Sequence, residues 1–298
     1  MELAMIGLGR MGGNMAHRLS DAGHRVVGWT RSGEPSLADE FGITWAGSLA
    51  DAVAALEQRP RVVWLMIPAG APTSSTVGEL TGLLAEGDIV VDGGNSNFRD
   101  SQEHARRLAE HGIEFIDCGT SGGVWGYENG YCLMMGGSDA AVATLAPAFE
   151  TLAPPDGWLH TGPVGSGHFT KMVHNGIEYA LMQAYGEGFE VLEKSEFELD
   201  LPAIAEVWRH SSVVRSWLLD LLASALKDDP KLEHIKGYVE DSGEGRWTVF
   251  EAINESVAAP TIAIALMARF TSRDPDPFAM KAIAALRNQF GGHAVVRE

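Results

Sequence analysis

The glycine pattern near the start of the chain constrains its fold more than any other feature. The sequence GLGRMG at residues 7–12 follows a short apolar run at 3–7, and a helical pattern continues behind it. A tight turn after a strand needs Gly7, close approach of the backbone to a pyrophosphate needs Gly9, and close packing of helix on strand needs Gly12. The N–H groups and the dipole of such a helix hold phosphates. The chain is therefore predicted to begin with a dinucleotide-binding unit.

The match to G-x-G-x-x-G is weak by itself, because glycines also serve turn geometry alone. Its position between a predicted strand and a predicted helix, with another apolar strand at 25–29, is the context that a nucleotide loop requires. This part of the cofactor site is assigned to Gly7, Leu8, Gly9, Arg10, Met11 and Gly12.

The rest of the N-terminal half alternates short apolar runs with helical patterns. Strands are predicted at 3–7, 25–29, 62–67, 88–94 and 114–119, and helices at 14–23, 48–56 and 100–112. Apolar strands separated by helices indicate a parallel sheet that is covered on both faces. Residues 1–162 are therefore predicted to form an α/β Rossmann domain with a doubly wound parallel sheet.

The second half of the chain has a helical pattern throughout. Helical segments, with prolines between them, lie at 169–197, 201–229, 247–259, 261–270 and 276–290. Residues 163–298 are therefore predicted to form an all-helical domain for substrate binding and oligomerisation. The segment 153–167, which is rich in glycine and proline, is predicted to be the hinge between the two domains.

The end of the second predicted strand favours NADP over NAD. NAD sites usually carry an acidic residue here, which binds the ribose 2′-hydroxyl, but this chain has Thr30, Arg31 and Ser32. A guanidinium beside two hydroxyls suits a 2′-phosphate. A solvated surface arginine is the alternative, and NAD stays possible. The remaining cofactor positions are assigned to Ile67, Pro68, Ala69 and Asn95.

A helix after the predicted hinge carries polar side chains where an apolar stripe is expected. The positions i, i+3, i+4 and i+7 hold Lys171, His174, Asn175 and Glu178, and Tyr179 follows. A salt-bridged solvent face is the alternative, although Lys171 and Glu178 are too far apart for a direct pair within a helix. Near a nicotinamide, a desolvated Lys171 suits a base and a buried Glu178 suits an acid. This face is therefore predicted to line a substrate site between the domains.

Charge and cysteine content limit the partners and the compartment. With 40 acidic against 22 basic residues, the chain lacks the positive surface that nucleic acids and anionic membranes require. Cys118 and Cys132 fit no metal-ligand pattern and are too few for a disulfide framework, so free thiols are predicted. No basic leader and no long uncharged apolar run is found. We therefore expect a cytoplasmic protein that binds neither nucleic acid nor membrane.

Four further motifs extend over the chain, namely DGGNSNFRDS at 92–101, GTSGGVWGYENGYCLMMGG at 119–137, GSGHFTKMVHNGIEYALMQ at 165–183 and RNQFGGH at 287–293. Together with GLGRMG they resemble the decarboxylating 6-phosphogluconate dehydrogenase family, and most closely its short bacterial form. The resemblance covers essentially the whole chain.

The resemblance implies oxidation of 6-phosphogluconate at C3 with hydride transfer to NADP or NAD. Loss of CO₂ and protonation of the enediol then give ribulose 5-phosphate, and no metal is needed. Lys171 matches the base that takes the hydroxyl proton and later polarises the ketone, and Glu178 matches the acid that protonates C1. The matching substrate-contacting positions are Asn95, Ser121, Gly122, Gly123, His174 and Asn175. The matching phosphate-binding positions are Tyr179, Arg246, Arg269, Arg287 and His293.

The resemblance also implies a homo-oligomer, a dimer or a tetramer, built on the helices within 202–226 and 260–270. A helix that stops at Gly291 and Gly292 would leave the following tail as a free end. In the long-form enzymes the residues that match Arg287 and His293 reach the site of the partner subunit. A monomer whose tail folds back is the alternative.

Two departures and two rival functions remain open. The helical region is about half that of the long-form enzymes, whose phosphate-contacting lysine appears here as Arg246, and the match at Arg269 is loose. One rival is another β-hydroxyacid dehydrogenase, such as 3-hydroxyisobutyrate dehydrogenase, which is not expected to carry HN…EY or RNQFGGH. The other is a non-catalytic NADP-binding sensor, which would need no acid–base pair.

Overall fold

A computed structural model describes residues 1–296 of the chain, and residues 297 and 298, the last two of the predicted helical domain, lie outside the described residues. The chain divides into two compact units, residues 1–173 and residues 174–298. The predicted boundary at 162/163 falls just before helix α8 (Ser166–Glu193), whose first eight residues belong to the first unit. That boundary stays a prediction.

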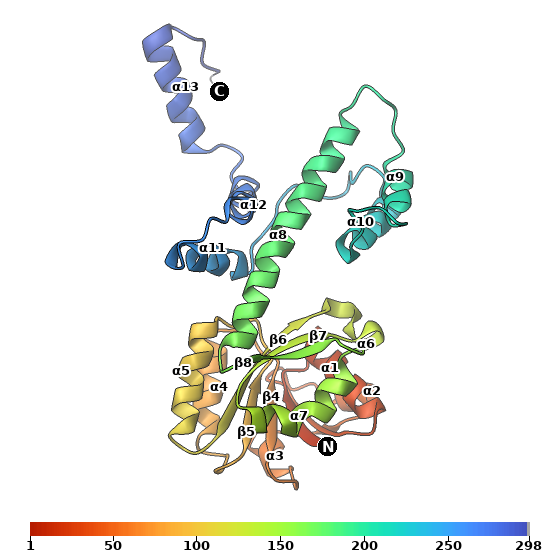
Figure 1. Ribbon diagram of the computed structural model, residues 1–298, viewed down its shortest axis with the longest axis vertical. Helices are drawn as coiled ribbons and strands as arrows, with labels where there is room; N and C mark the ends of the chain where they lie inside the picture. The colour runs from red at the N-terminus through yellow and green to blue at the C-terminus, as the bar shows by residue number, and fades with distance from the viewer. Residues whose placement is uncertain (297–298) are drawn as a thin grey trace. The chain divides into compact units, whose positions relative to one another are not determined.

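The first unit is built on one sheet of eight strands in the order β3-β2-β1-β4-β5-β6-β7-β8 (Figure 1). The strands are β1 (Glu2–Ile6), β2 (Arg25–Trp29), β3 (Thr44–Trp45), β4 (Val62–Leu65), β5 (Ile89–Asp92), β6 (Glu114–Ser121), β7 (Cys132–Gly136) and β8 (Trp158–Gly162). The first six strands have the doubly wound order 3-2-1-4-5-6, in which the direction of winding reverses between β1 and β4. The predicted α/β Rossmann fold is confirmed.

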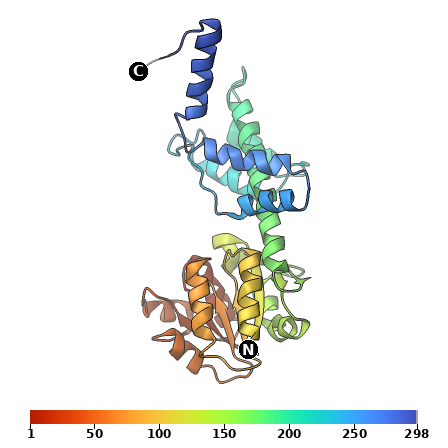
Figure 2. The same cartoon turned by 90° about the vertical axis from the view of Figure 1, so that its left-hand side faces the viewer.

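Helices cover both faces of this sheet. They are α1 (Arg10–Asp21), α2 (Ser36–Phe41), α3 (Leu49–Ala54), α4 (Ala71–Leu80), α5 (Phe98–Ala109), the short helices η1 (Gly123–Trp125) and α6 (Gly126–Asn129), and α7 (Asp139–Leu152). Strand alternation directs Leu3 and Met5 of β1 to the core under α1 and α7, and Ala4 and Ile6 to the core under α3, α4 and α5. Figure 2 shows α4 and α5, in orange and yellow, side by side over this second face.

The C-terminal part of the sheet departs from the prediction. Strand β7 runs antiparallel to β6, so the sheet is not wholly parallel. The segment 153–167, predicted as the hinge, contains β8, which pairs with β7 along the edge of the sheet. Its glycines and prolines suggested a loop, but an edge strand needs only one partner and tolerates a weak apolar pattern.

The second unit is helical, as predicted. It contains the rest of α8 and the helices α9 (Leu201–Trp208), α10 (Trp217–Asp228), α11 (Glu244–Asn254), α12 (Pro260–Thr271) and α13 (Phe278–Gly291). The predicted helical stretch 201–229 is interrupted, because Ser216 caps a new helix by accepting a hydrogen bond from Leu219 N at 3.1 Å. Helix α13 ends at the predicted position, where Gly292 adopts a left-handed conformation.

Several large apolar side chains of this unit are exposed. On α13 they are Phe278, Met280, Ile283 and Leu286, with relative exposures of 82%, 57%, 48% and 63%. Scattered apolar residues are normal on a protein surface, but a continuous apolar helix face usually marks an interface.

Two further expectations concern the cysteines and the membrane. Cys118 and Cys132 are free thiols, as predicted. Burial raises the pKa of the Cys118 thiol to about 12, whereas Cys132 is exposed. Within residues 1–296, the helices lack the combination of length and apolar composition that a membrane crossing requires.

Candidate active site

The loop between β1 and α1 has the backbone geometry of a phosphate-binding turn. Gly7 has a φ of +94°, and a Cβ there would lie 2.5 Å from Met66 O. A Cβ on Gly12 would lie 1.9 Å from Gly7 O, so only glycine lets the helix approach the strand this closely. Apart from the neighbouring backbone and the two adjacent residues, no described atom lies within 4 Å of the place where a Cβ on Gly9 would be. The three glycines thus meet the demands of a nucleotide loop, with open space beside Gly9.

Helix α1 offers a favourable end to an anion. Its first turn carries no acidic residue, and the N–H groups of a first helical turn have no partner within the helix. Leu8 is buried behind the loop, while Gly9 and Arg10 are exposed. The described residues of this loop therefore fit the pyrophosphate of a dinucleotide.

The other predicted cofactor residues gather at the same edge of the sheet. Strands β2, β1, β4 and β5 are parallel neighbours, so their carboxyl ends lie side by side. These ends are followed by Thr30, Arg31 and Ser32, by Ile67, Pro68 and Ala69, and by Asn95. Arg31 is exposed and makes no hydrogen bond or ion pair within residues 1–296, so its guanidinium is available to a ligand.

Buried side chains hold two of these strand-end loops in place. Asp92, which is fully buried, accepts hydrogen bonds from Gly94 N at 3.0 Å and from Ser96 Oγ at 2.7 Å, on either side of Asn95. Thr73 Oγ1 donates to Pro68 O at 2.9 Å. The positions of Asn95 and Pro68 are thus fixed by the first unit itself.

The predicted substrate loop with Ser121, Gly122 and Gly123 follows β6 at this edge. Helix α1 braces the segment behind it, because Asn14 Nδ2 donates to Val124 O at 3.0 Å and Arg18 Nη1 donates to Tyr127 O at 2.7 Å. Arg18 Nε also donates to Thr151 O at 2.8 Å. One face of the nucleotide helix therefore positions the segment that follows the substrate loop.

Lys171 lies on the first part of α8, against β6. It is buried, and a Cβ on Gly119 would lie 2.4 Å from the Cβ of Lys171. A Cβ on Gly167, one turn earlier on α8, would lie 2.4 Å from Asp117 O and 2.5 Å from Met134 O. The start of α8 thus packs directly on the backbone of β6 and β7. Lys171 lies against Gly119, which precedes Ser121 by two residues on β6.

A buried carboxylate fixes the start of α8. Asp117 Oδ1 accepts from Gly165 N at 2.7 Å, and Oδ2 accepts from His168 N at 2.8 Å. Burial raises the pKa of the Asp117 carboxyl, while the charge and the N–H group of His168 act in the opposite direction. The His168 ring is itself held by Ser101 Oγ, 2.7 Å from Nδ1. This network positions the turn that precedes Lys171.

In the second unit, α8 presents the other polar residues of the predicted face. His174 Nδ1 lies 2.9 Å from Asn175 Oδ1 and 3.9 Å from Glu178 Oε2. Asn175 and Tyr179 are buried, whereas the Glu178 side chain is 34% exposed, so the expected burial of this carboxyl is only partial. A cavity of about 280 Å³ is lined by Asn175, Glu178, Tyr179, Met182, Glu240, Asp241, Ser242 and Arg269.

Two arginines are connected to this cavity, Arg269 as a lining residue and Arg246 through the lining residue Asp241. The Arg269 guanidinium lies 3.5 Å from the centre of the Tyr179 ring, and its Nη1 donates to Glu240 O at 2.7 Å. Arg246 forms a bidentate pair with Asp241, at 2.7 and 3.1 Å. The hydrogen bond from Arg246 holds the pKa of Asp241 below its usual value. The cavity is thus lined by a stacked cation, Arg269, while Arg246 lies behind it, paired with the lining residue Asp241.

The tail residues are not brought to this cavity. Arg287 and His293 are exposed and are not among the side chains that line it. Asn288 Nδ2 donates to His293 O at 2.9 Å, which closes the end of α13 on itself.

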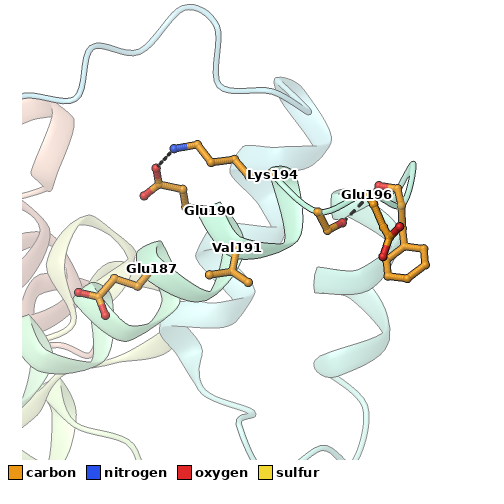
Figure 3. A pocket seen from close by; sticks show the side chains of 7 residues that line it. Glu187, Glu190, Val191, Lys194 and Glu196 are labelled. Atoms are coloured by element: carbon orange, nitrogen blue, oxygen red, sulfur yellow. Dashed lines mark hydrogen bonds and ion pairs between the residues drawn. The ribbon is translucent and has the colours of Figure 1, made fainter.

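A second hollow lies at the far end of α8 and has a different character (Figure 3). It measures about 650 Å³ and is lined by Glu187, Glu190, Val191, Lys194, Ser195, Glu196 and Phe197. Lys194 is paired with Glu190, so carboxylates dominate its charge. The cavity near the start of α8 differs from it in having a guanidinium, that of Arg269, stacked on the ring of Tyr179, so the polar face of α8 is the candidate site.

Several residues of the candidate site were missed by sequence reasoning. They are Asp117, which holds α8, and Met182, Glu240, Asp241, Ser242 and Glu244 in the second unit. The segment DSGEGRWT at 241–248 held a signal, since an aspartate, a serine and a glutamate beside the predicted Arg246 are typical of a helix start. It was interpreted for its arginine alone.

Comparisons with known proteins match both units. Residues 2–164 match the family described as the NAD binding domain of 6-phosphogluconate dehydrogenase. Residues 167–293 match the family described as the 6-phosphogluconate dehydrogenase C-terminal domain. The NAD(+)-dependent, decarboxylating 6-phosphogluconate dehydrogenase of Haloferax volcanii is 44% identical over 301 residues, which cover 100% of this chain and 99% of the relative.

The fold of the chain is also similar to that of solved structures. The 6-phosphogluconate dehydrogenase of Plasmodium falciparum, studied with its cofactor NADP+ and with its substrate 6-phosphogluconate, superposes with a TM-score of 0.83 at 26% identity, covering 100% of this chain and 66% of the other. The 3-hydroxyisobutyrate dehydrogenase of Mycobacterium tuberculosis gives a TM-score of 0.70 at 22% identity, covering 89% of this chain and 90% of the other. The second likeness shows a shared fold.

Proposed function

Because this chain belongs to the 6-phosphogluconate dehydrogenase family, we propose that it oxidises and decarboxylates 6-phosphogluconate to ribulose 5-phosphate and CO₂ with NADP or NAD. The observation that carries the proposal is the polar face of α8, where Lys171 is buried and Asn175 and Tyr179 line or adjoin a cavity with Arg269. A helix that only served packing would place apolar side chains at these positions.

The substrate has a carboxylate at one end and a phosphate at the other. The Tyr179 hydroxyl and the Arg269 guanidinium, which stacks on the Tyr179 ring, suit the phosphate, and Arg246, paired with Asp241, is a second cation for it. His174 and Asn175 offer donors and acceptors to the sugar hydroxyls and the carboxylate. Asn95, Ser121, Gly122 and Gly123 are assigned to the same substrate, and Arg287 and His293 to its phosphate.

Helix α8 supplies the groups that transfer protons in this reaction. The bound nicotinamide would supply the hydride acceptor for C3. Lys171 takes the proton of the C3 hydroxyl and then, as an ammonium, donates a hydrogen bond to the new ketone oxygen. When the C1 carboxyl leaves as CO₂, the electrons of the broken bond move into that ketone, whose oxygen takes a proton from the Lys171 ammonium, and an enediol forms. This proton returns to Lys171 when the enediol becomes a ketone in the last step. Glu178 then protonates the carbon that lost CO₂, which yields ribulose 5-phosphate.

The preferred cofactor is NADP in this proposal. Arg31 with Thr30 and Ser32 supports it, because a cation and two hydroxyls stand where a carboxylate would bind the NAD ribose. The relative from Haloferax volcanii is named NAD(+)-dependent, so the two cofactors are to be compared directly.

Turnover of the purified protein tests the function. We expect reduction of the nicotinamide with 6-phosphogluconate, and equimolar release of CO₂ and ribulose 5-phosphate. The same protein is expected to be inactive with 3-hydroxyisobutyrate, which has no phosphate for Tyr179 and Arg269. Cofactor binding without turnover of either compound would instead support a sensor.

We further propose that the chain is a homo-oligomer in which each subunit completes the site of its partner. The exposed apolar face of α13 supports an interface, and a two-fold interface would exchange both tails reciprocally. Arg287 and His293 would then bind the phosphate in the site of the other subunit. The helices α9, α10 and α12, which fall in the ranges predicted for assembly, would supply the remaining contacts.

Mixing two inactive variants, Lys171→Ala and Arg287→Ala, is expected to restore activity. In a hybrid dimer with exchanged tails, one site carries both defects and the other carries neither. Differently tagged subunits allow hybrids to be purified, and their turnover is compared with that of each variant alone. Inactive hybrids of proven composition would show that the tail serves its own subunit.

A cytoplasmic location completes the proposal. The two free thiols support it, since a reducing compartment keeps cysteines unpaired.

A further inference from the structure

The buried carboxylate of Glu244 touches the candidate substrate site without lining it. Glu244 is the first residue of α11 and only 2% exposed. A carboxylate only accepts hydrogen bonds, and burial is costly unless both of its oxygens find donors. Here Oε1 accepts from Asn175 Nδ2 at 3.0 Å, and Oε2 accepts from Ser242 Oγ. The helix N-terminus also favours a negative charge at this position.

This contact fixes the orientation of the Asn175 amide. The carbonyl oxygen of the amide cannot face a carboxylate oxygen at hydrogen-bond distance, so the NH₂ group faces Glu244 and Oδ1 faces the other way. Oδ1 lies 2.9 Å from His174 Nδ1. Since a carbonyl oxygen only accepts, the hydrogen of this contact is on Nδ1. The Glu178 carboxylate, 3.9 Å from the same nitrogen, favours that hydrogen as well.

The neutral His174 ring is thereby set to the form with its hydrogen on Nδ1, and Nε2 is the acceptor. The same carboxylate takes the hydrogen of Ser242 Oγ. Tyr179 Oη accepts from Ser242 N at 2.9 Å and lies 3.2 Å from Ser242 Oγ. Because Ser242 Oγ has already donated its hydrogen, any hydrogen between these two oxygens comes from Tyr179. One carboxylate therefore sets the donor and acceptor pattern of His174, Asn175 and Tyr179.

We propose that Glu244 is a positioning residue, whose buried contact with Asn175 holds the His174 ring with Nε2 as the acceptor that meets the substrate. The proposal rests on the proposed function for the identity of that substrate, but not for the hydrogen-bond chain itself. Glu244 touches no reacting atom in this scheme, and it acts only through Asn175 and Ser242.

Two variants of similar size separate positioning from packing. In Glu244→Gln the amide oxygen still accepts from Asn175, while its NH₂ group can donate to Ser242 Oγ. In Glu244→Met both acceptors are lost, although the volume is nearly kept. Glu255→Met is the matched control, because Glu255 is exposed at the end of the same helix. Thermal unfolding of each variant reports on the fold.

Nitrogen NMR of histidine-labelled protein, in the full-length chain and without substrate, reads the His174 ring directly. The His174 signals are identified by their loss in His174→Gln. We expect the Nδ1-protonated form in the wild type, in Glu244→Gln and in Glu255→Met, and a mixture of both neutral forms in Glu244→Met. In the kinetic assay, kcat/KM for 6-phosphogluconate should fall about tenfold or more in Glu244→Met, as is typical when a group that orients a binding side chain is lost. Glu244→Gln should recover most of it.

The two readouts distinguish two failures. If the folded Glu244→Met protein keeps the wild-type His174 signals, Glu244 does not position the ring and the inference is wrong. If the ring responds as expected but the wild type never turns over 6-phosphogluconate, the proposed function fails while the positioning role of Glu244 stands. Equal losses in Glu244→Gln and Glu244→Met would also contradict the inference, because Gln keeps the acceptor for Asn175.

Discussion

Replacing Lys171 by alanine is expected to lower kcat at least ~10²-fold, which is the usual loss when a positioned general base is removed. Lys171 is buried against Gly119 of β6, so water cannot simply take its place beside a substrate hydroxyl. Cofactor affinity should change little, because the nucleotide loop lies on other elements. Stopped-flow turnover and fluorescence titration of the reduced cofactor measure the two quantities separately.

A second variant and a control make this result specific. Lys171→Met keeps most of the buried volume and should lose as much activity as Lys171→Ala, with a smaller effect on thermal unfolding. Lys194→Ala removes the lysine that directly follows the same helix, where it is exposed and paired with Glu190, and should leave kcat unchanged. Near-normal turnover in folded Lys171→Ala would rule out this lysine as the base.

Replacing Arg31 by alanine is expected to raise the KM for NADP much more than the KM for NAD. Only NADP carries the 2′-phosphate, and a charge-assisted hydrogen bond to it is worth ~1.5–3 kcal/mol, or roughly ten- to 150-fold in affinity. Arg31 is exposed and engages no described residue, so its loss should leave the fold intact. Steady-state kinetics with both cofactors, at one fixed salt concentration, give the ratio.

The control for this change is Arg106→Ala, which removes an exposed arginine of α5 that forms ion pairs with Glu103 and with Glu110, the residue that caps the end of the helix. It should shift neither KM. A wild-type enzyme that already prefers NAD would overturn the role given to Arg31, and the chain would then resemble its NAD(+)-dependent relative in cofactor use.

The sequence predicted the strongly patterned parts of the fold. Strands β1, β4 and β5 are completely buried, so their apolar runs are continuous and easily recognised. Strand β3 has only two residues, and β8 is an edge strand with one partner, so neither leaves a pattern that a short window can detect. The turn between α9 and α10 is followed by a new helix that Ser216 caps. The apolar pattern continues through this position, so the break is not visible in it.

The candidate site shows a similar division. Residues that follow strands, such as Thr30 and Asn95, can be expected at one edge of the sheet from the sequence alone, because parallel strands end there. Contacts between distant segments could not be predicted in this way. Asn175 and Glu244 are 69 positions apart, and Asp117 meets His168 across 51. Nothing local in a sequence tells which carboxylate reaches which amide, and that pairing is decided only when the helices pack.

The close approach of α8 to the sheet has a consequence for how this gene can vary. A methyl group added at Gly119 would lie 2.4 Å from the Lys171 Cβ, and one added at Gly167 would lie equally close to Asp117 O. A third position, Gly136, has Asp117 Oδ1 at 2.5 Å from its would-be Cβ. Even a substitution by alanine at one of these glycines would push α8 away from the strands and move Lys171 with it. Natural variation should therefore spare these three glycines, because the absence of a side chain at each of them lets the start of α8, with Lys171, lie directly on the sheet.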